Sequence, residues 1–209
     1  MQLLPPLKQT SLGTPRDIGS LLGMLSQKFG ENPSIYAQFG LIGHNGLDWP
    51  CYTGTEVYAS HDGIVETSID SASGLGVVIK GNGLKTIYWH FKNFSVSMGD
   101  EVKTGDLIGH ADNTGFSTGS HLHYGLKLLD LNGNVLNRNN GYDGAIDPTS
   151  YLVWFGTSKP MTQKEVRQLQ SLEGYKDEAG VTYWTGKPLS DYLKARLQDK
   201  IKTLQEANV

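Results

Sequence analysis

Short strand-like segments recur from Gly43 onward, and no helical pattern lies between them. Turn signals such as Asp62-Gly63 and Asn82-Gly83 separate the segments, and such pairs are typical of tight turns between strands. The 26 glycines also favour a turn-dense body over a helical bundle. We therefore expect a mainly β fold, an antiparallel β-sandwich or open barrel. The candidate strands are residues 56–59, 63–69, 76–80, 85–91, 106–110 and 121–130.

The last of these segments carries two histidines on a rigid element. Read as a strand, its residues alternate between two faces, so His121, His123 and Lys127 share one face. The two imidazoles then project side by side, which suits one metal ion or one substrate atom. A surface strand with two solvated histidines is the plain alternative. The opposite, apolar face consists of Leu122, Tyr124, Leu126 and Leu128.

The segment 85–91 carries a third histidine, His90. Alternation divides this strand into two faces, and we expect one to enter the core and the other to display His90. A single displayed histidine is usually solvated, so His90 becomes informative only if it shares a face with His121 and His123. The expected core residues are Ile87, Trp89 and Phe91, and the expected displayed residues are Thr86, Tyr88 and His90.

A fourth histidine and a carboxylate lie four residues apart, at His44 and Asp48. Gly43 and Gly46 disfavour a helix here, so we expect the pair on a bent strand or loop. A hydrolytic zinc site uses three protein ligands and an open position for water, and histidines beyond three would then be acid–base groups. The single cysteine, Cys51, excludes an internal disulfide and a multi-cysteine zinc site, and we expect it to be a small buried hydrophobe.

Charge and hydropathy argue against two classes of partner. The formal net charge of -3 and the pI near 6.0 give no electrostatic footprint for DNA or RNA. No stretch approaches the length of a membrane span. The start of the chain lacks the basic segment and apolar core of a secretion signal. We expect either that a signal has been removed or that the protein reaches its site by another route.

Composition divides the 209 residues into three parts. In the first part, Thr14-Pro15-Arg16-Asp17 is typical of the start of a short helix. The body holds all the candidate strands and ends after an irregular, Asn- and Gly-rich loop. The expected parts are an N-terminal lead-in at 1–23, the body at 24–155 and a small α-rich appendage at 160–209.

The appendage is expected to be a helix, a hairpin and a second helix. Thr162-x-x-Glu165 is a capping box, which is typical of a helix start. A hairpin is expected over 175–184, and apolar residues at helical spacing predict a second helix from about Leu189. We expect this part to dock on the body or on a partner protein.

Three histidine motifs follow one another along the chain: Gly43-His44-x-Gly46-x-Asp48, Ile87-Tyr88-x-His90 and Gly119-x-His121-Leu122-His123. Together they resemble the motifs of the lysostaphin-type (LytM-like) zinc endopeptidases, which cut bacterial peptidoglycan. Supporting stretches at 57–65, 102–109 and 113–119 also match that family. The resemblance spans about residues 24–152, and it implies the lysostaphin-type peptidase fold for the body.

The resemblance implies that His44, Asp48 and His123 bind one Zn²⁺ per chain. It also implies that His90 and His121 flank the metal as the catalytic histidines, and Tyr36 is a loosely aligned candidate for a tyrosine that often assists them. Zinc lowers the pKa of a bound water from about 15.7 to about 7. A positioned histidine that moves a proton typically adds about 10²–10⁴-fold to the rate.

The implied activity is hydrolysis of cross-bridge or stem peptides of peptidoglycan, although the motifs do not specify the bond. The implied place of action is extracellular, in the cell wall or in the periplasm. A chain without a recognisable signal and with an unmatched tail would also suit a phage-encoded lysin. The chain departs from the family pattern at Trp89, Ser120 and Tyr124, and these positions affect the shape of the pocket rather than the ligand set.

Two other functions are compatible with parts of the sequence. A catalytically silent member of the same fold, acting as an activator or scaffold for cell-wall hydrolysis, would be expected to lack a metal ligand, and here every ligand position is filled. A lipoyl- or biotinyl-type carrier would fit the stretch 102–106. That function needs a lysine displayed at a hairpin tip, and no suitable motif is present.

Overall fold

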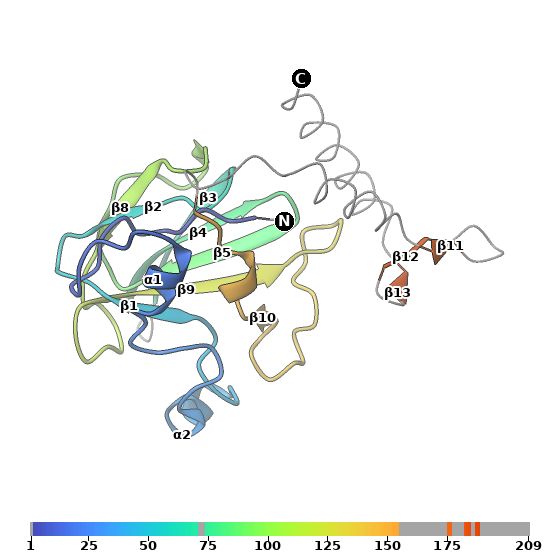
Figure 1. Ribbon diagram of the computed structural model, residues 1–209, viewed down its shortest axis with the longest axis horizontal. Coiled ribbons are helices and arrows are strands. Elements are labelled where there is room, and N and C mark those ends of the chain that lie inside the picture. Colours follow the sequence, from blue (N-terminus) through green and yellow to red (C-terminus); the bar gives the residue numbers. More distant parts are fainter. Residues whose placement is uncertain (1, 71–73, 155–174, 177–181, 185–186, 189–209) are drawn as a thin grey trace. The chain divides into compact units, whose positions relative to one another are not determined.

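The computed structural model describes residues 2–70 and 74–154, together with three short strands near the C-terminus (Figure 1). The chain divides into two units, Met1–Phe155 and Gly156–Val209, and each is described by itself.

The first unit is built on two antiparallel sheets. The larger sheet has the strand order β1-β9-β5-β4-β3-β7, with β10 beside β9, and the smaller has the order β2-β8-β6. The expectation of a mainly β, antiparallel body is therefore confirmed. The larger sheet contains β1 (Leu47–Pro50), β3 (Gly63–Asp70), β4 (Gly74–Gly81), β5 (Leu84–Trp89), β7 (Glu101–Val102), β9 (His121–Leu128) and β10 (Ala145–Ile146). The smaller sheet contains β2 (Glu56–Tyr58), β6 (Phe91–Phe94) and β8 (Leu107–Ala111).

Helical elements in this unit are short. The expected helix after residue 14 is α1 (Ile18–Leu22), where the Asp17 side chain accepts a 2.7 Å hydrogen bond from the Ser20 backbone N–H. The others are α2 (Pro33–Tyr36), η1 (Ala37–Phe39) and η2 (Thr149–Tyr151). In the described parts of the chain, no helix has the length and apolar character needed to cross a membrane.

Strand β9, which lies between β1 and β5, has the predicted faces. Leu122, Tyr124 and Leu126 are fully buried in the hydrophobic core. His123 and Lys127 point to the opposite face, which we call the groove face. The metal-ligand candidates therefore lie on the side of the sheet away from the main core.

The predicted faces of β5 are wrong. Tyr88 is fully buried and packs against Tyr124, with ring centroids 5.3 Å apart. Because Trp89 is paired with His123 across the ladder, Trp89 and Ile87 lie on the groove face instead of in the core. Each face of this strand carries large apolar or aromatic residues, so the pairing with β9, and not hydropathy, decides the orientation.

The N-terminal segment contributes to this core. Leu3, Leu7 and Leu21 are all buried within the main hydrophobic cluster. The Leu3 backbone N–H donates a 2.8 Å hydrogen bond to the carbonyl of Tyr151, which fastens the start of the unit to its end.

The second unit is described only at its strands, β11 (Tyr175–Lys176), β12 (Thr182–Trp184) and β13 (Lys187–Pro188). β11 and β12 pair antiparallel, as expected for a hairpin over 175–184, and β13 pairs with β12. The two helices expected on either side of the hairpin, and most of the expected appendage at 160–209, lie outside the described residues.

Two buried tyrosines of the core offer a matched test of its polar contacts. The Ser60 backbone N–H donates a 2.9 Å hydrogen bond to the Tyr88 hydroxyl. The buried Tyr124 hydroxyl lies near the Ser60 side chain but makes no hydrogen bond of normal geometry among the described residues. Tyr88→Phe should lower the free energy of unfolding by about 1–3 kcal/mol, because a buried N–H loses its acceptor. Tyr124→Phe should leave it unchanged or raise it. Urea denaturation measures both, and equal losses in the two variants would contradict the assignment.

Candidate metal centre

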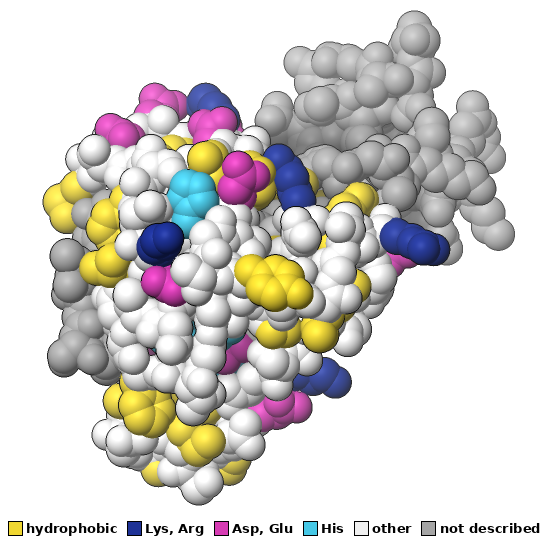
Figure 2. Space-filling model, turned by 90° about the vertical axis from the view of Figure 1, so that its left-hand side faces the viewer, with side chains coloured by type: hydrophobic (Ala, Val, Ile, Leu, Met, Phe, Trp, Pro, Cys, Tyr) yellow, Lys and Arg dark blue, Asp and Glu magenta, His cyan; other side chains and the backbone are white. Residues whose placement is uncertain are grey.

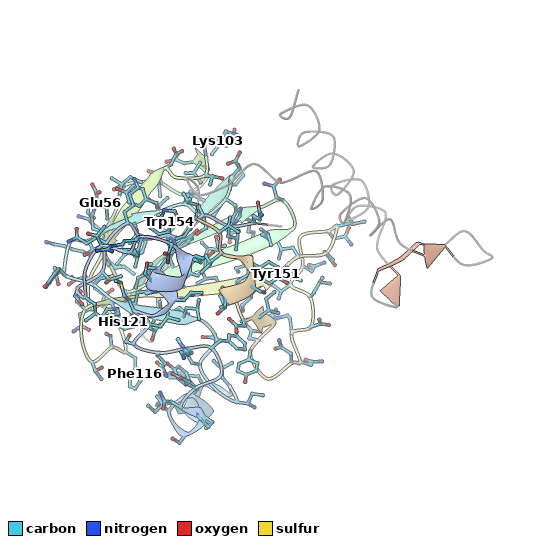
Figure 3. The ribbon with its side chains drawn as sticks, viewed as in Figure 1. Glu56, Lys103, Phe116, His121, Tyr151 and Trp154 are labelled. Carbon is cyan, nitrogen blue, oxygen red and sulfur yellow. The ribbon has the colours of Figure 1, made fainter. Side chains whose placement is uncertain are left out.

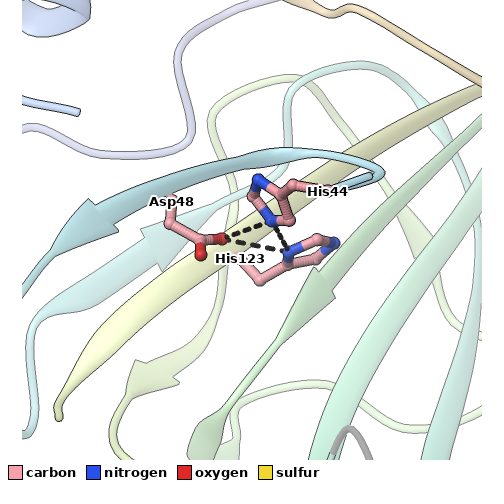
Figure 4. Close-up of side chains that lie close together, drawn as sticks. All are labelled: His44, Asp48 and His123. Carbon is pink, nitrogen blue, oxygen red and sulfur yellow. Dashed lines mark hydrogen bonds and ion pairs between the residues drawn. The ribbon is translucent and has the colours of Figure 1, made fainter. Parts of the chain in front are cut away.

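The ladder between β1 and β9 brings a carboxylate and an imidazole together. Asp48 lies directly opposite His123 in this antiparallel pair. His44 precedes β1 in a loop, as expected for a segment flanked by Gly43 and Gly46. In Figure 4 the three side chains converge. The distances are 3.0 Å from His123 Nδ1 to Asp48 Oδ1, 3.1 Å from His44 Nε2 to Asp48 Oδ1, and 2.9 Å between the two nitrogens.

A backbone carbonyl fixes the tautomer of His44. Its Nδ1–H donates to the Lys28 carbonyl oxygen at 3.1 Å, so Nε2 keeps its lone pair and faces the cluster. Three electron-pair donors then meet in one buried space, since His44, Asp48 and His123 are all buried. A proton or a cation is needed to relieve this convergence.

This donor set fits a zinc ion. Zinc binds imidazole nitrogen and carboxylate oxygen at about 2.0–2.2 Å in a tetrahedral arrangement, which places neighbouring ligand atoms roughly 3.3 Å apart. The observed separations of 2.9–3.1 Å require only a small expansion. Two neutral imidazoles and one carboxylate would give the site a net charge of +1 with the ion.

Electrostatics keep the Asp48 carboxylate ionised. Burial alone would raise its pKa, but hydrogen bonds from His123 and His44 outweigh burial and hold the pKa well below its usual range. Burial lowers the pKa of His123, which favours the neutral imidazole that a metal requires.

Gly46 gives the space that His123 needs. A Cβ atom at Gly46 would lie 2.6 Å from His123 Cε1 and 2.6 Å from the Tyr124 carbonyl oxygen. Any side chain at this position would therefore displace either the ring or the β9 backbone. This contact explains the glycine between His44 and Asp48.

His90 reaches the site through an unusual backbone conformation. Its φ is +68°, in the left-handed region that non-glycine residues rarely adopt. The predicted single strand 85–91 is consequently broken here, with β5 ending at Trp89 and β6 beginning at Phe91. The His90 ring lies 4.3 Å from that of His121 and 6.3 Å from that of His123, measured between centroids.

The protonation state of His90 is set by its surroundings. Nδ1 lies 2.6 Å from the Thr114 carbonyl oxygen, so Nδ1 carries the proton and Nε2 is free to accept one. Burial and the neighbouring His121 lower the pKa of His90 to about 4. His90 is therefore a neutral imidazole at physiological pH.

His121 stands at the start of β9, next to the ligand cluster but outside it. Its Nδ1 donates to the Gly119 carbonyl oxygen at 2.8 Å, and its Nε2 lies 3.6 Å from Asp48 Oδ2. The Ser117 hydroxyl also lies 3.1 Å from Nδ1. The ring is thus oriented with Nε2 toward the space above the ligands.

Tyr36 and His61 lie outside the cluster of candidate ligands. The Tyr36 ring stacks on His44 at 5.2 Å, and its hydroxyl donates to Gln27 Oε1 at 2.8 Å. Burial and the nearby Asp48 charge raise the pKa of Tyr36 above its usual value. His61 lies in the bend between β2 and β3 and is buried, with Nε2 3.0 Å from the Thr86 hydroxyl.

Two loops flank the site and meet each other. Phe39, just after α2, contacts Phe116 with ring centroids 5.6 Å apart. Figure 3 shows Phe116 close to α2 and His121 at the start of β9. Ile35, Phe39, Ile42 and Phe116 are exposed, and hydrophobic side chains gather at the end of the molecule where α2 lies (Figure 2).

Sequence reasoning missed the groups that orient the histidines. These are the backbone carbonyls of Lys28, Thr114 and Gly119. The stretch containing Thr114 and Gly119 was recognised as a family signature, but its carbonyls carry no residue-specific signal. Cys51 is buried and free, as expected, and burial raises the pKa of its thiol to about 12.

Residues 42–138 match the model of peptidase family M23. This part of the chain belongs to that family. The resemblance read from the three histidine motifs is therefore confirmed. Residues 1–41 and 139–209 lie outside the matched region.

Relatives of known structure and of curated sequence agree with this assignment. The catalytic domain of lysostaphin from Staphylococcus simulans aligns with a TM-score of 0.50 and 26% identity, over 61% of this chain and 90% of that domain. The peptidoglycan DD-endopeptidase ShyA of Vibrio cholerae is 35% identical over 127 residues, which is 60% of this chain and 30% of ShyA. The glycyl-glycine endopeptidase ALE-1 of Staphylococcus capitis is 39% identical over 85 residues, or 39% of this chain and 24% of ALE-1. The chain spans less than a third of the length of either curated relative.

Proposed function

We propose that the M23 domain is a zinc-dependent endopeptidase that hydrolyses peptide bonds of bacterial peptidoglycan. The observation that supports this most is the buried convergence of His44, Asp48 and His123 beside two further histidines. The curated relatives named above are endopeptidases, one of them named for peptidoglycan. A catalytically silent activator, the alternative within the same fold, would have no need for this complete set.

In this proposal, His44 Nε2, Asp48 Oδ1 and His123 Nδ1 hold one Zn²⁺. A zinc ion bound there would supply a Lewis acid for the scissile carbonyl and lower the pKa of water. His90 is neutral with Nε2 free, so it is suited to accept a proton from water. His121 points Nε2 at the same space, and as an imidazolium, with Nδ1–H still bonded to the Gly119 carbonyl, it is suited to donate a hydrogen bond to the oxygen of the carbonyl under attack. The Tyr36 ring stacks on His44.

We further propose that the protein acts outside the cytoplasm, where its substrate lies. A secreted bacterial enzyme and a phage-encoded lysin would both meet that substrate. We also propose that residues 160–209 form a small α-rich appendage that docks on the body or on a partner protein.

The test uses the full chain on purified peptidoglycans that differ in their cross-links. We expect about one zinc per chain, release of soluble fragments with new peptide termini, loss of release in chelator and recovery on adding zinc. Metal analysis and mass spectrometry of the fragments give these readouts. A protein that binds no zinc and releases no fragments would instead be the silent activator.

A further inference from the structure

A groove of about 470 Å³ lies on the groove face of the larger sheet, beside the candidate metal centre. Asn45, which follows His44 directly, lines this groove together with Trp89 from β5 and Lys127 from β9. The groove is therefore lined in part by β9 and by the loop of His44, which carry two of the candidate ligands.

On β9 the groove face runs from the candidate ligand His123 to Lys127, and Gly125 between them is buried beside the backbone of Asn45. On β9 the residues of this face are His123, Gly125 and Lys127. A Cβ atom built at Gly125 would lie 3.5 Å from Ile87 Cβ, 3.6 Å from the Asn45 carbonyl oxygen and 3.7 Å from His123 Nε2, so a side chain there would press against the Asn45 loop that lines the groove. His123 and Lys127 are four residues apart, which in a strand is about 13 Å.

The indole of Trp89 lines the end of the groove near His123. A Cβ atom at Gly76 would lie 2.0 Å from Trp89 Cε3, so the indole lies flat over a position that only glycine permits. Trp89 is also the cross-strand neighbour of His123. A peptide in the groove would pass over this indole before it reaches the candidate metal ligands.

A row of three lysines crosses the same face of the sheet, and two of them, Lys85 and Lys127, line the groove. Lys80, Lys85 and Lys127 are neighbours in register across β4, β5 and β9. Like charges opposite one another destabilise a sheet, so such a row requires counter-charges. The two outer lysines have them: Lys80 Nζ lies 2.8 Å from Glu66 Oε1, and Lys127 Nζ lies 2.6 Å from Asp143 Oδ2.

The central lysine lacks such a partner. Among the residues that the structure describes, Lys85 has no ion pair or hydrogen bond to its ammonium group. Burial and the charges of Lys80 and Lys127 lower its pKa, while Glu66 and Asp143 act in the opposite direction. Lys85 is thus a partly buried cation that lines the groove, and none of the described carboxylates forms an ion pair with it.

We propose that Lys85 binds a carboxylate of the peptide substrate. The inference rests on the proposed function. It implies that the protein prefers stem peptides with free carboxylates to uncharged glycine bridges and to amidated peptides. An extended peptide advances about 3.3–3.6 Å per residue. The recognised carboxylate would therefore lie roughly three to four residues from the scissile bond, or on a branch of similar length.

The test compares two stem-peptide substrates that differ only in whether their carboxylates are free or amidated. Wild-type protein should show a KM about tenfold lower for the free-carboxylate peptide, since charge-assisted hydrogen bonds are the stronger class. Lys85→Gln should raise that KM about tenfold, leave kcat within about twofold, and remove the preference. Lys92→Gln, which changes an exposed lysine on β6, is the control and should keep the preference.

Folding and activity are monitored separately. Lys85→Gln should keep or raise the Tm, because it removes repulsion between neighbouring lysines. Calorimetric binding of both peptides gives a readout even if nothing is cleaved. Preferential binding that depends on Lys85, without cleavage, would overturn the proposed activity but not this inference. Equal KM and equal affinity for both peptides, or a preference that survives Lys85→Gln, would overturn the inference and leave the activity standing.

Discussion

Asp48→Asn is expected to release the metal and to abolish cleavage. Asp48 is the one anionic member of the ligand cluster and contacts both imidazoles, at 3.0 and 3.1 Å. Asparagine keeps the size of the side chain but removes the charge that attracts a cation. Metal catalysis contributes several kcal/mol, and each 1.36 kcal/mol is tenfold in rate, so cleavage should fall by at least about 10³-fold.

Zinc content after dialysis and the release of soluble cell-wall fragments measure this effect together. Asp147→Asn makes the same chemical change at an exposed position, where the side chain accepts a hydrogen bond from the Thr149 backbone N–H. The control should keep both zinc and activity. An Asp48→Asn protein that still holds one zinc per chain would remove Asp48 from the ligand set.

Changes at His90 and His121 should have a different signature, in which zinc stays and cleavage is lost. Neither ring belongs to the ligand cluster, and His121 Nε2 is 3.6 Å from the nearest Asp48 oxygen. Loss of one hydrogen-bond donor to the developing oxyanion costs about 10²–10³-fold in kcat. We therefore expect His121→Ala to retain about one zinc per chain while its kcat falls in that range.

The residue that replaces His90 must be compatible with its backbone conformation. Because φ is +68°, asparagine is a better choice than alanine, since asparagine tolerates the left-handed region. His90→Asn should likewise keep zinc and lose activity. His110→Ala serves as the control, because His110 lies on β8 and its Nδ1 bonds Asn93. Retained cleavage in both test variants would refute the assigned roles, and zinc loss in His121→Ala would make His121 a ligand.

The sequence predicted β9 well because its two faces differ sharply. Every large apolar residue falls on one face, and the other carries only His121, His123, Gly125 and Lys127. The same reasoning failed for β5, where Tyr88 and Trp89 are both aromatic and periodicity cannot choose between them. The pairing of Trp89 with His123 decides the orientation, and that pairing is a long-range property.

The sequence predicted those site residues whose function depends on a distinctive side chain. His44, Asp48, His90, His121 and His123 are rare, chemically distinct residue types in a recognisable order. The carbonyls of Lys28, Thr114 and Gly119 were not readable, since every residue has a carbonyl and only the fold selects which one is used. The left-handed turn at His90 was also hidden, because histidine does not favour that conformation as glycine does.

The strand that carries Asp48 is the outermost strand of its sheet, and residues far upstream cover its free side. Ser26 N–H donates to the Asp48 carbonyl, and Asp48 N–H donates to the Gln27 carbonyl, each at 2.9 Å. The Trp49 indole N–H also bonds the Leu21 carbonyl at 2.9 Å. A protein trimmed to the family-matched stretch from residue 42 would lack all three of these contacts. Its uncovered edge would favour pairing between chains. Strand β1, which carries Asp48, would also have no hydrogen bonds on that side.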